Sequence, residues 1–436
     1  MIPRKAGRLQ RLSILTLAVA TATTLGACGA SGAASNVERG SGVPVGSDSA
    51  AYAEALKDMD PVTIRFGGMT TGPGTPGVDA FVDWGKKVTE MSGGKINFDF
   101  DFAGAKVPLD KMADALGQGR IDMGLYIQSY QPDKWPVANL VTAMSMYVSP
   151  APLTGRLATF GGEAEFGLTW EPVTKEAEAA GIHPLYPIYP AGDTRLMCAG
   201  DGAVSSLADL KGKQIRVVDK TQAALATELG ATPVSLTFPE LFTGLQRGVV
   251  DCAINSLSSY ASGGFDAVLS SWISGTKPGG DFIDTPQGWG ISQKLWNRLP
   301  LAAQQLIWDS QADMVEGQLR GQFTSLMDGV EALRAAKGRT YDFDDEVTSK
   351  IAAFNEKNAA NVAKQIEDAG LATDGAAVVK QYKDLVEKWI GIVEGDLGNP
   401  ADLSWGTVTR AEAEAIDVGA FADKFYQEVL LPHRPA

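Results

Sequence analysis

Histidine and cysteine are scarce in this chain of 436 residues, which contains two histidines and three cysteines. His183 and His433 are far apart in the sequence, and no group of cysteines and histidines has metal-ligand spacing. This makes a zinc cluster or a Ser-His-Asp triad improbable. The nucleophile motif G-x-S-x-G is missing as well. We therefore expect no catalytic residues, no metal and no cofactor.

Positive charge is also in short supply, because the formal net charge is −14 at pH 7. Such a surface disfavours general binding to nucleic acid or to an anionic membrane, so we expect no nucleic-acid partner. An anionic small molecule could still bind, but it would need local cationic groups. The length is sufficient for two domains with sizeable cores.

The N-terminus has no apolar run long enough to cross a bilayer. Residues 1–27 carry four basic residues, no acid and an apolar run of about 16 residues, whereas a span needs roughly 20. The pattern indicates an export signal. It ends Leu25-Gly26-Ala27-Cys28, which resembles the lipobox of bacterial lipoproteins. We expect a signal peptide at 1–27 and a mature protein anchored to the outer face of the cell membrane by lipidated Cys28. The alternative is an ordinary signal peptide cut nearby.

Residues 28–60 are rich in Gly, Ser, Ala and acids without a period, and are predicted to be a flexible tether. If Cys28 is lipidated, Cys198 and Cys252 remain as a pair outside the cell, where disulfides persist. Two alternatives stay open for this pair: a disulfide or two buried free thiols.

Residues 211–260 predict a βαβαβ passage around which the rest of the chain is organised. Short apolar strands are expected at 214–218, 233–236 and 249–254, with helices between them. Thr237 and Glu240 have capping-box spacing at the start of the second helix. Ligands of such units bind beyond the carboxyl ends of the strands. Two polar residues, Arg216 and Asn255, lie at or near those ends.

An earlier segment repeats part of this passage. LGQGRIDMG at 116–124 aligns with LQRGVVDCA at 245–253, and both predict a helix, a glycine stop and an apolar strand with an aspartate near its start. The recurrence indicates two similar lobes. A glycine pattern at 72–77 formally matches G-x-G-x-x-G, but Pro73 and Pro76 remove N–H groups that a dinucleotide loop uses. We interpret it as a ligand-lining turn.

Three segments together resemble the solute-binding proteins of TRAP transporters, the DctP-like family: LADLKGKQIRV, LGATPVSLTFPELFTGLQRGVVDCAIN and GISQKLWNRLP. The resemblance implies an α/β, two-lobed periplasmic-binding-protein-like fold (type II-like) with hinge strands and a long bracing helix, expected within 301–337. Lobe 1 would comprise residues 61–193 and about 287–320. Lobe 2 would comprise 194–286 and about 321–436, including the C-terminal helices.

The resemblance also implies roles for individual residues. Arg216 matches an arginine that forms a salt bridge with the ligand carboxylate, and Arg195 matches a second arginine that contacts it. Asn255 matches an amide that hydrogen-bonds the ligand, and Phe238 an aromatic residue of the pocket wall. Contacts from lobe 1 align less sharply. The candidates are Met69, Thr70, Tyr126 and Gln128, with Trp289 and Tyr260 as wall residues.

The implied function is capture of an organic acid and its delivery to the membrane subunits of a TRAP permease by hinge closure. The binding protein is expected to be a monomer and not an enzyme. Two alternatives remain open at this point: an exported hydrolase, or a binding protein that serves an ABC permease or a sensor.

Overall fold

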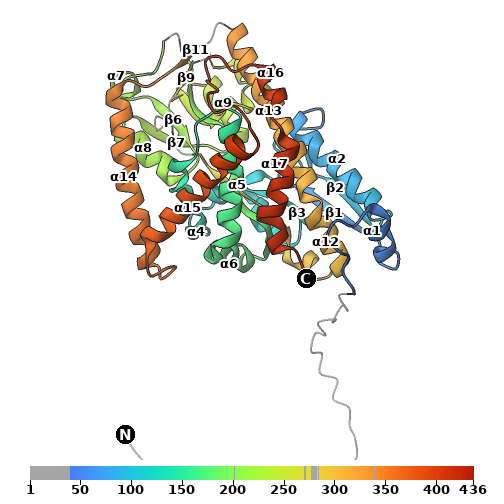
Figure 1. The fold of residues 1–436 in the computed structure, drawn as a ribbon. Coiled ribbons are helices and arrows are strands. Elements are labelled where there is room, and N and C mark those ends of the chain that lie inside the picture. Colours follow the sequence, from blue (N-terminus) through green and yellow to red (C-terminus); the bar gives the residue numbers. More distant parts are fainter. Residues whose placement is uncertain (1–39, 201, 270–271, 276–281, 283, 337–338) are drawn as a thin grey trace, which may run out of the picture. The chain divides into compact units, whose positions relative to one another are not determined.

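The computed structural model describes residues 40–436 except 201, 270–271, 276–281, 283 and 337–338. Two sheets with flanking helices form an α/β structure, as predicted (Figure 1). The predicted signal peptide, Cys28 and the first part of the predicted tether lie outside the described residues.

The first sheet has five strands in the order β2-β1-β3-β10-β4. β1 is parallel to β2 and β3, whereas β10 is antiparallel to both of its neighbours. β10 enters this sheet from a distant part of the chain, because the chain leaves the first sheet after β4, returns to it at β10 and leaves it again. The strands are β1 Val62–Gly67, β2 Ile96–Phe100, β3 Met123–Tyr126, β4 Ile182–Pro190 and β10 Pro286–Ser292.

The second sheet has six strands in the order β11-β9-β5-β8-β6-β7. The parallel strands β8-β6-β7 form the βαβαβ passage predicted from residues 211–260, and β11 is parallel to β9. The strands are β5 Thr194–Cys198, β6 Gln214–Val217, β7 Thr232–Ser235, β8 Cys252–Ser256, β9 Trp272–Ser274 and β11 Arg339–Tyr341.

We call each sheet with the helices that follow its strands a lobe. Lobe 1 contains α2 Pro76–Met91, α3 Met112–Gln118, α4 Pro136–Thr142, α5 Thr154–Thr169 and α6 Glu171–Ala179, and lobe 2 contains α7 Leu207–Leu210, α8 Lys220–Glu228, α9 Phe238–Gln246 and α10 Ser259–Ser262. The capping box predicted for α9 is formed, because the Glu240 carboxylate accepts the Thr237 backbone N–H at 2.8 Å.

The repeated sequence segment has the same structure in both lobes. Gly119 and Gly248 both end their helices with positive φ, at 71° and 68°. The aspartate that follows each glycine accepts a backbone N–H from the neighbouring parallel strand: Asp122 from Arg65 at 3.0 Å and Asp251 from Gln214 at 2.8 Å. The same arrangement therefore joins the first strand of each βαβαβ unit to its third, β1 to β3 in lobe 1 and β6 to β8 in lobe 2.

The long helix predicted at 301–337 is interrupted at Ser310. It forms α12 Leu301–Asp309 and α13 Gln311–Ala335, preceded by the short α11 Gln293–Trp296. α13 packs on both lobes through glycines that permit close approach. Gly321 lies against the backbone of Pro76 in α2, and Gly329 lies against Leu257 beside α10. α13 therefore braces both lobes.

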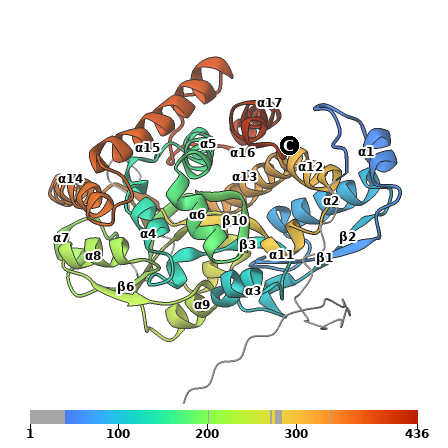
Figure 2. The same cartoon turned by 90° about the horizontal axis from the view of Figure 1, so that it is seen from below.

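The C-terminal helices differ from the prediction that assigned them to lobe 2. α15 Gly375–Ile390 packs along α5 of lobe 1, where Gly161 and Gly162 leave no room for a Cβ beneath Trp389 and Val386. Phe421 and Phe425 of α17 Val418–Phe425 pack on Phe160 of α5. α14 Asp345–Asp368 contacts α8 as well as α4, and α16 Arg410–Ala415 lies on α13. In Figure 2, α15, α5 and α17 lie together on one side of the first sheet.

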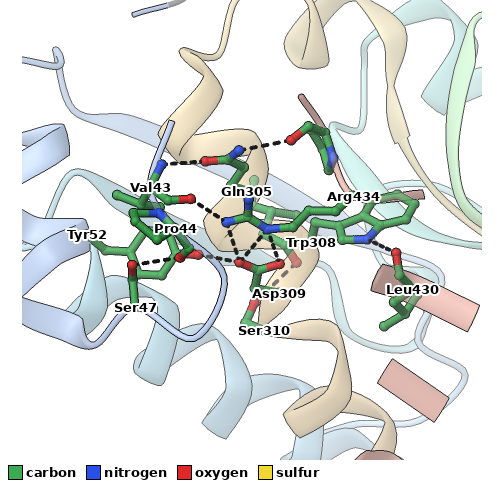
Figure 3. A network of polar contacts seen from close by, with 12 residues as sticks. Val43, Pro44, Ser47, Tyr52, Gln305, Trp308, Asp309, Ser310, Leu430 and Arg434 are labelled. Carbon is green, nitrogen blue, oxygen red and sulfur yellow. Dashed lines mark hydrogen bonds and ion pairs between the residues drawn. The ribbon is translucent and has the colours of Figure 1, made fainter. Parts of the chain in front are cut away.

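The N-terminal part of the described chain is fastened to the C-terminal part. α1 Ser49–Leu56, assigned to the tether from sequence, buries Tyr52 and Leu56 and packs on α12. Asp309 of α12 accepts hydrogen bonds from the Arg434 guanidinium and from the Tyr52 hydroxyl (Figure 3). It also accepts one from the Tyr426 hydroxyl at 2.9 Å. Arg434 also donates to the Val43 carbonyl at 2.9 Å. Residues 43–56 are therefore part of the packed body.

Candidate functional site

A cavity of about 220 Å³ lies where the carboxyl ends of strands from both sheets meet α13. Apolar side chains from both lobes supply much of its wall, including Met69, Phe81, Leu125, Val218, Phe238 and Ile254. The described lining residues include one cationic side chain, Arg216, and one acidic side chain, Asp284. The position agrees with the general rule for ligand sites in α/β sheets.

Arg216 is the main charged feature of the cavity and is only 3% exposed. From β6, its Nε donates to the Leu236 carbonyl at 3.0 Å and its Nη1 to the Ile254 carbonyl at 2.9 Å. No carboxylate of the described residues lies within ion-pair distance of this guanidinium. Burial lowers the pKa of Arg216, and Tyr130 and Asp219 oppose that shift only in part. A ligand carboxylate would supply the missing counter-charge.

Asn255 and Phe238, two further candidates from the sequence, also line the cavity. Asn255 is the next-to-last residue of β8, and its Nδ2 donates to the Ser259 hydroxyl at 2.7 Å. Phe238 is the first residue of α9, and its backbone N–H donates to the Tyr130 hydroxyl of lobe 1 at 3.2 Å. Of the lobe 1 candidates, Met69 and Thr70 are in the lining.

Arg195 does not reach this cavity, and the predicted pair of arginines around one carboxylate is corrected here. Its guanidinium donates to the carbonyls of Thr194 and Pro150 and lies 4.5 Å from the Trp405 ring centroid. Arg195 is opposite Asn255 in the β5–β8 ladder, but the two carbonyls and the cation–π contact with Trp405, from the C-terminal part of the chain, hold its guanidinium outside the lining.

Four further candidates belong to the core rather than to the cavity. Tyr126 is fully buried against Trp135, and Gln128 donates to the Pro187 carbonyl at 2.9 Å. Trp289 stacks behind Phe81 and donates to Gln311, and Tyr260 is fully buried beside α13. Because strand residues alternate between faces, a shift of one position separates a lining residue from a core residue. Leu125 and Ile127, on either side of Tyr126, are in the lining.

Several lining residues were missed by the sequence analysis. The polar ones on α13 are Gln318, Gln322 and Ser325, which follow an i, i+4, i+7 spacing. That spacing places them on one helix face and could have been recognised, because amides interrupt the apolar pattern of 301–337 there. Tyr130, Asp284 and Thr285 carried no such signal, since they lie on connections.

The acids near the cavity are strongly affected by burial. Burial raises the pKa of Asp219 to about 6, although backbone N–H groups and Thr285 hydrogen-bond its carboxylate. Burial also raises the pKa of Asp284, against the opposing charge of Arg156 and the hydrogen bond from the Thr194 hydroxyl. Neither acid pairs directly with Arg216, so the guanidinium stays available.

Contacts between the lobes surround the cavity. Lys220 of lobe 2 and Asp133 of lobe 1 form an exposed ion pair at 3.1 Å. Gln222 donates to the Thr285 hydroxyl at 3.2 Å. Together with the Tyr130–Phe238 hydrogen bond, they hold the two lobes against each other.

Cys198 and Cys252 form a disulfide between β5 and β8, where they are opposite each other in the ladder. Among the described residues, no group of three or more His, Cys, Asp or Glu is arranged to hold a metal ion. Within the same residues, no helix combines the length and apolar character needed to cross a membrane.

Two α/β lobes with a cavity between them, joined by crossing strands and braced by a helix, define a two-lobed solute-binding protein. The family described as DctP, bacterial extracellular solute-binding protein, family 7, matches residues 67–368. The chain therefore belongs to this family of extracytoplasmic binding proteins. The predicted binding role is confirmed, and the hydrolase alternative is wrong.

Individual relatives are distant in sequence. A monocarboxylate 2-oxoacid-binding periplasmic protein of Nostoc is 24% identical over 295 residues, covering 62% of this chain and 75% of its own. A Rhodoferax ferrireducens TRAP solute-binding protein, solved with copurified benzoate, has a TM-score of 0.64 at 20% identity and covers 76% of this chain and 99% of its own. A sugar acid binding protein of Advenella mimigardefordensis, solved with galactonate, has a TM-score of 0.62 at 20% identity over 76% and 100%. These likenesses show the fold.

Proposed function

We propose that this protein captures a monocarboxylate with a largely apolar body and delivers it to a TRAP-type permease. One observation carries the proposal: the cavity contains a buried arginine, Arg216, that has no carboxylate partner among the described residues. A guanidinium binds a carboxylate through parallel charge-assisted hydrogen bonds. One lining cation matches one carboxylate, and the apolar wall matches an apolar body. The acids bound by the Nostoc and Rhodoferax proteins are of this class.

Mass spectrometry of ligand released from the purified protein tests the ligand class, and we expect a monocarboxylic acid. Isothermal titration calorimetry of Arg216→Ala with that acid should then show a loss of about 2–5 kcal/mol in binding free energy. Arg247→Ala, on the exposed end of α9, is the matched control and should bind like the wild type. Unchanged affinity in Arg216→Ala would contradict the proposal.

Delivery would follow closure of the lobes over the acid, which excludes water from the cavity. In this proposal the closed protein docks as a monomer on the permease, and an ion gradient rather than ATP drives transport. Membrane vesicles that contain the permease subunits should take up labelled acid only when this protein is added. Uptake should stop when the ion gradient is dissipated. Dependence on ATP would favour an ABC permease, and acid-induced kinase activity would favour a sensor.

Anchoring is a separate proposal, which rests on the Leu25-Gly26-Ala27-Cys28 sequence. Cleavage before Cys28 and acylation of its thiol would attach the protein to the outer face of the cell membrane. The wild type should then incorporate labelled palmitate and sediment with membranes, whereas Cys28→Ser should do neither. Release of the wild type into the soluble fraction would instead indicate an ordinary signal peptide.

A further inference from the structure

Besides Arg216 on β6, the cavity has polar side chains on the wall formed by α13. Gln318, Gln322 and Ser325 all line the cavity from this helix. A carboxylate bound to Arg216 on β6 would use the cationic side of the cavity. The amides of α13 are additional hydrogen-bonding groups from a different element.

Gln322 is distinguished by the fixed orientation of its amide. Its Oε1 accepts two hydrogen bonds from Arg156, from Nε at 3.2 Å and from Nη2 at 2.8 Å. Arginine has donors and no acceptor, so only the amide oxygen can face it. The Nε2 group with its two N–H donors must then face away from Arg156. No hydrogen bond from Nε2 to another described residue is formed.

The surroundings of Arg156 are buried and contain several acids. It belongs to α5 and is 3% exposed. Its charge favours the ionised forms of three buried acids around it, Glu163, Asp193 and Asp284. Arg156 thus lies in a buried, acidic environment and directs Nε and Nη2 at the Gln322 amide oxygen.

We propose that Gln322 donates a hydrogen bond to a second oxygen of the bound acid, and that Arg156 is the positioning residue that orients the Gln322 amide for this purpose. The inference rests on the proposed function, because it assumes that a carboxylate occupies Arg216. It narrows the ligand class to monocarboxylates that carry a hydroxyl or oxo oxygen besides the carboxylate. An acid without such an oxygen would leave the Gln322 donors without a partner and would bind less tightly.

Paired probes that differ in one oxygen test the inference by calorimetry. The pairs are benzoate with 3-hydroxybenzoate, and propionate with pyruvate. The wild type should bind the oxygenated acid more tightly in at least one pair, by about two- to tenfold. Gln322→Met, which keeps the side-chain size but has no donor, should abolish this preference. Thr324→Val on the exposed face of α13 is the control and should keep the preference.

Variants of Arg156 separate positioning from a merely structural role. In Arg156→Met the amide can turn over, so the preference should fall by about twofold while the bare acid still binds. Arg156→Lys retains a donor toward Oε1 and should restore the preference. Arg156→Met removes a buried cation and could fail to fold. In that case the oxygen preferences of Arg156→Lys and Gln322→Met test the inference.

The outcomes distinguish this inference from the proposed function. If the probes bind, Arg216→Ala abolishes binding and Gln322→Met leaves the oxygen preference intact, the inference is overturned and the proposed function stands. If the wild type binds none of the four acids, or Arg216→Ala binds them normally, the proposed function fails and the inference falls with it.

Discussion

Arg216 is a buried arginine and Arg434 a largely buried one, but their surroundings are opposite. Arg434 has 11% side-chain exposure and pairs with Asp309 through Nε and Nη2 at 2.9–3.0 Å. Burial acts to lower the pKa of Arg434, but Asp309 and Tyr52 outweigh it and the pKa is raised. Arg216 donates to two backbone carbonyls and interacts with the Tyr130 hydroxyl, and burial lowers its pKa.

The difference indicates what each charge is for. The Arg434 network is complete within the chain and joins residues near both ends of the packed body. The Arg216 guanidinium lines a cavity and has no carboxylate partner within the described part of the chain. A charge neutralised inside the protein contributes to stability, whereas a buried charge without a counter-ion is costly until a ligand supplies one.

Breaking the complete pair should have the largest effect. Arg434→Met leaves Asp309 without its cation and should lower the free energy of unfolding by about 3–5 kcal/mol. Affinity for the acid should not change. Urea denaturation followed by circular dichroism measures the first quantity and calorimetry the second. Arg216→Met should behave in the opposite way, with lost affinity and no loss of stability in the free protein. Equal destabilisation by both variants would contradict the comparison.

A buried acid without a cationic partner extends the comparison to carboxylates. Burial, with a smaller contribution from Asp284, raises the pKa of Glu163 to about 8, against the hydrogen bond from Tyr382 and the charge of Arg156. The unfolded chain releases this proton near pH 4.5, so stability should fall as the pH rises from there to about 8.

Glu163→Gln keeps an acceptor for the Tyr382 hydroxyl and cannot ionise. At pH 7 it should be more stable than the wild type by at most about 3 kcal/mol, and the advantage should shrink toward pH 5. Melting temperatures across this pH range measure the effect. Glu412→Gln, at an exposed helix cap, is a control for the loss of one carboxylate. A constant difference between Glu163→Gln and the wild type at all pH values would show that titration is not the cause.

The exposed ion pair between the lobes should matter least. Lys220 and Asp133 have side-chain exposures of 68% and 93%, and such pairs contribute about 0–1 kcal/mol. Lys220→Ala should therefore weaken acid binding by less than about fivefold, and the effect should disappear at high salt. Calorimetry at two salt concentrations tests this. A large loss at high salt would show that the pair contributes more than its exposure indicates.

The parts of the site predictable from sequence are those set by local pattern. The strand and helix periods of residues 211–260 place Arg216 and Asn255 at the carboxyl ends of β6 and β8, where a ligand site is expected. The repeated aspartates, Asp122 and Asp251, also predict two lobes of similar structure. These features depend on contacts between neighbouring elements of the chain.

The parts that were not predictable depend on distant contacts. The Arg195 guanidinium contacts the ring of Trp405, which lies more than two hundred residues later in the chain. The sequence around Arg195 does not predict that contact. The position of α15 on lobe 1 depends on Gly161 and Gly162, whose closeness to Trp389 is visible only in three dimensions. Tyr126 was misplaced because alternation along β3 could be assigned to either face.

The disulfide between β5 and β8 has a practical consequence for producing the protein. It links the strand that enters lobe 2 to the strand that carries Asn255, and disulfides of this kind form in oxidising compartments. Material made in a reducing cytosol would therefore contain two thiols beside the binding site. Recombinant preparations for ligand screening should be secreted, or refolded with an oxidant, and their free thiols counted before any affinity is compared.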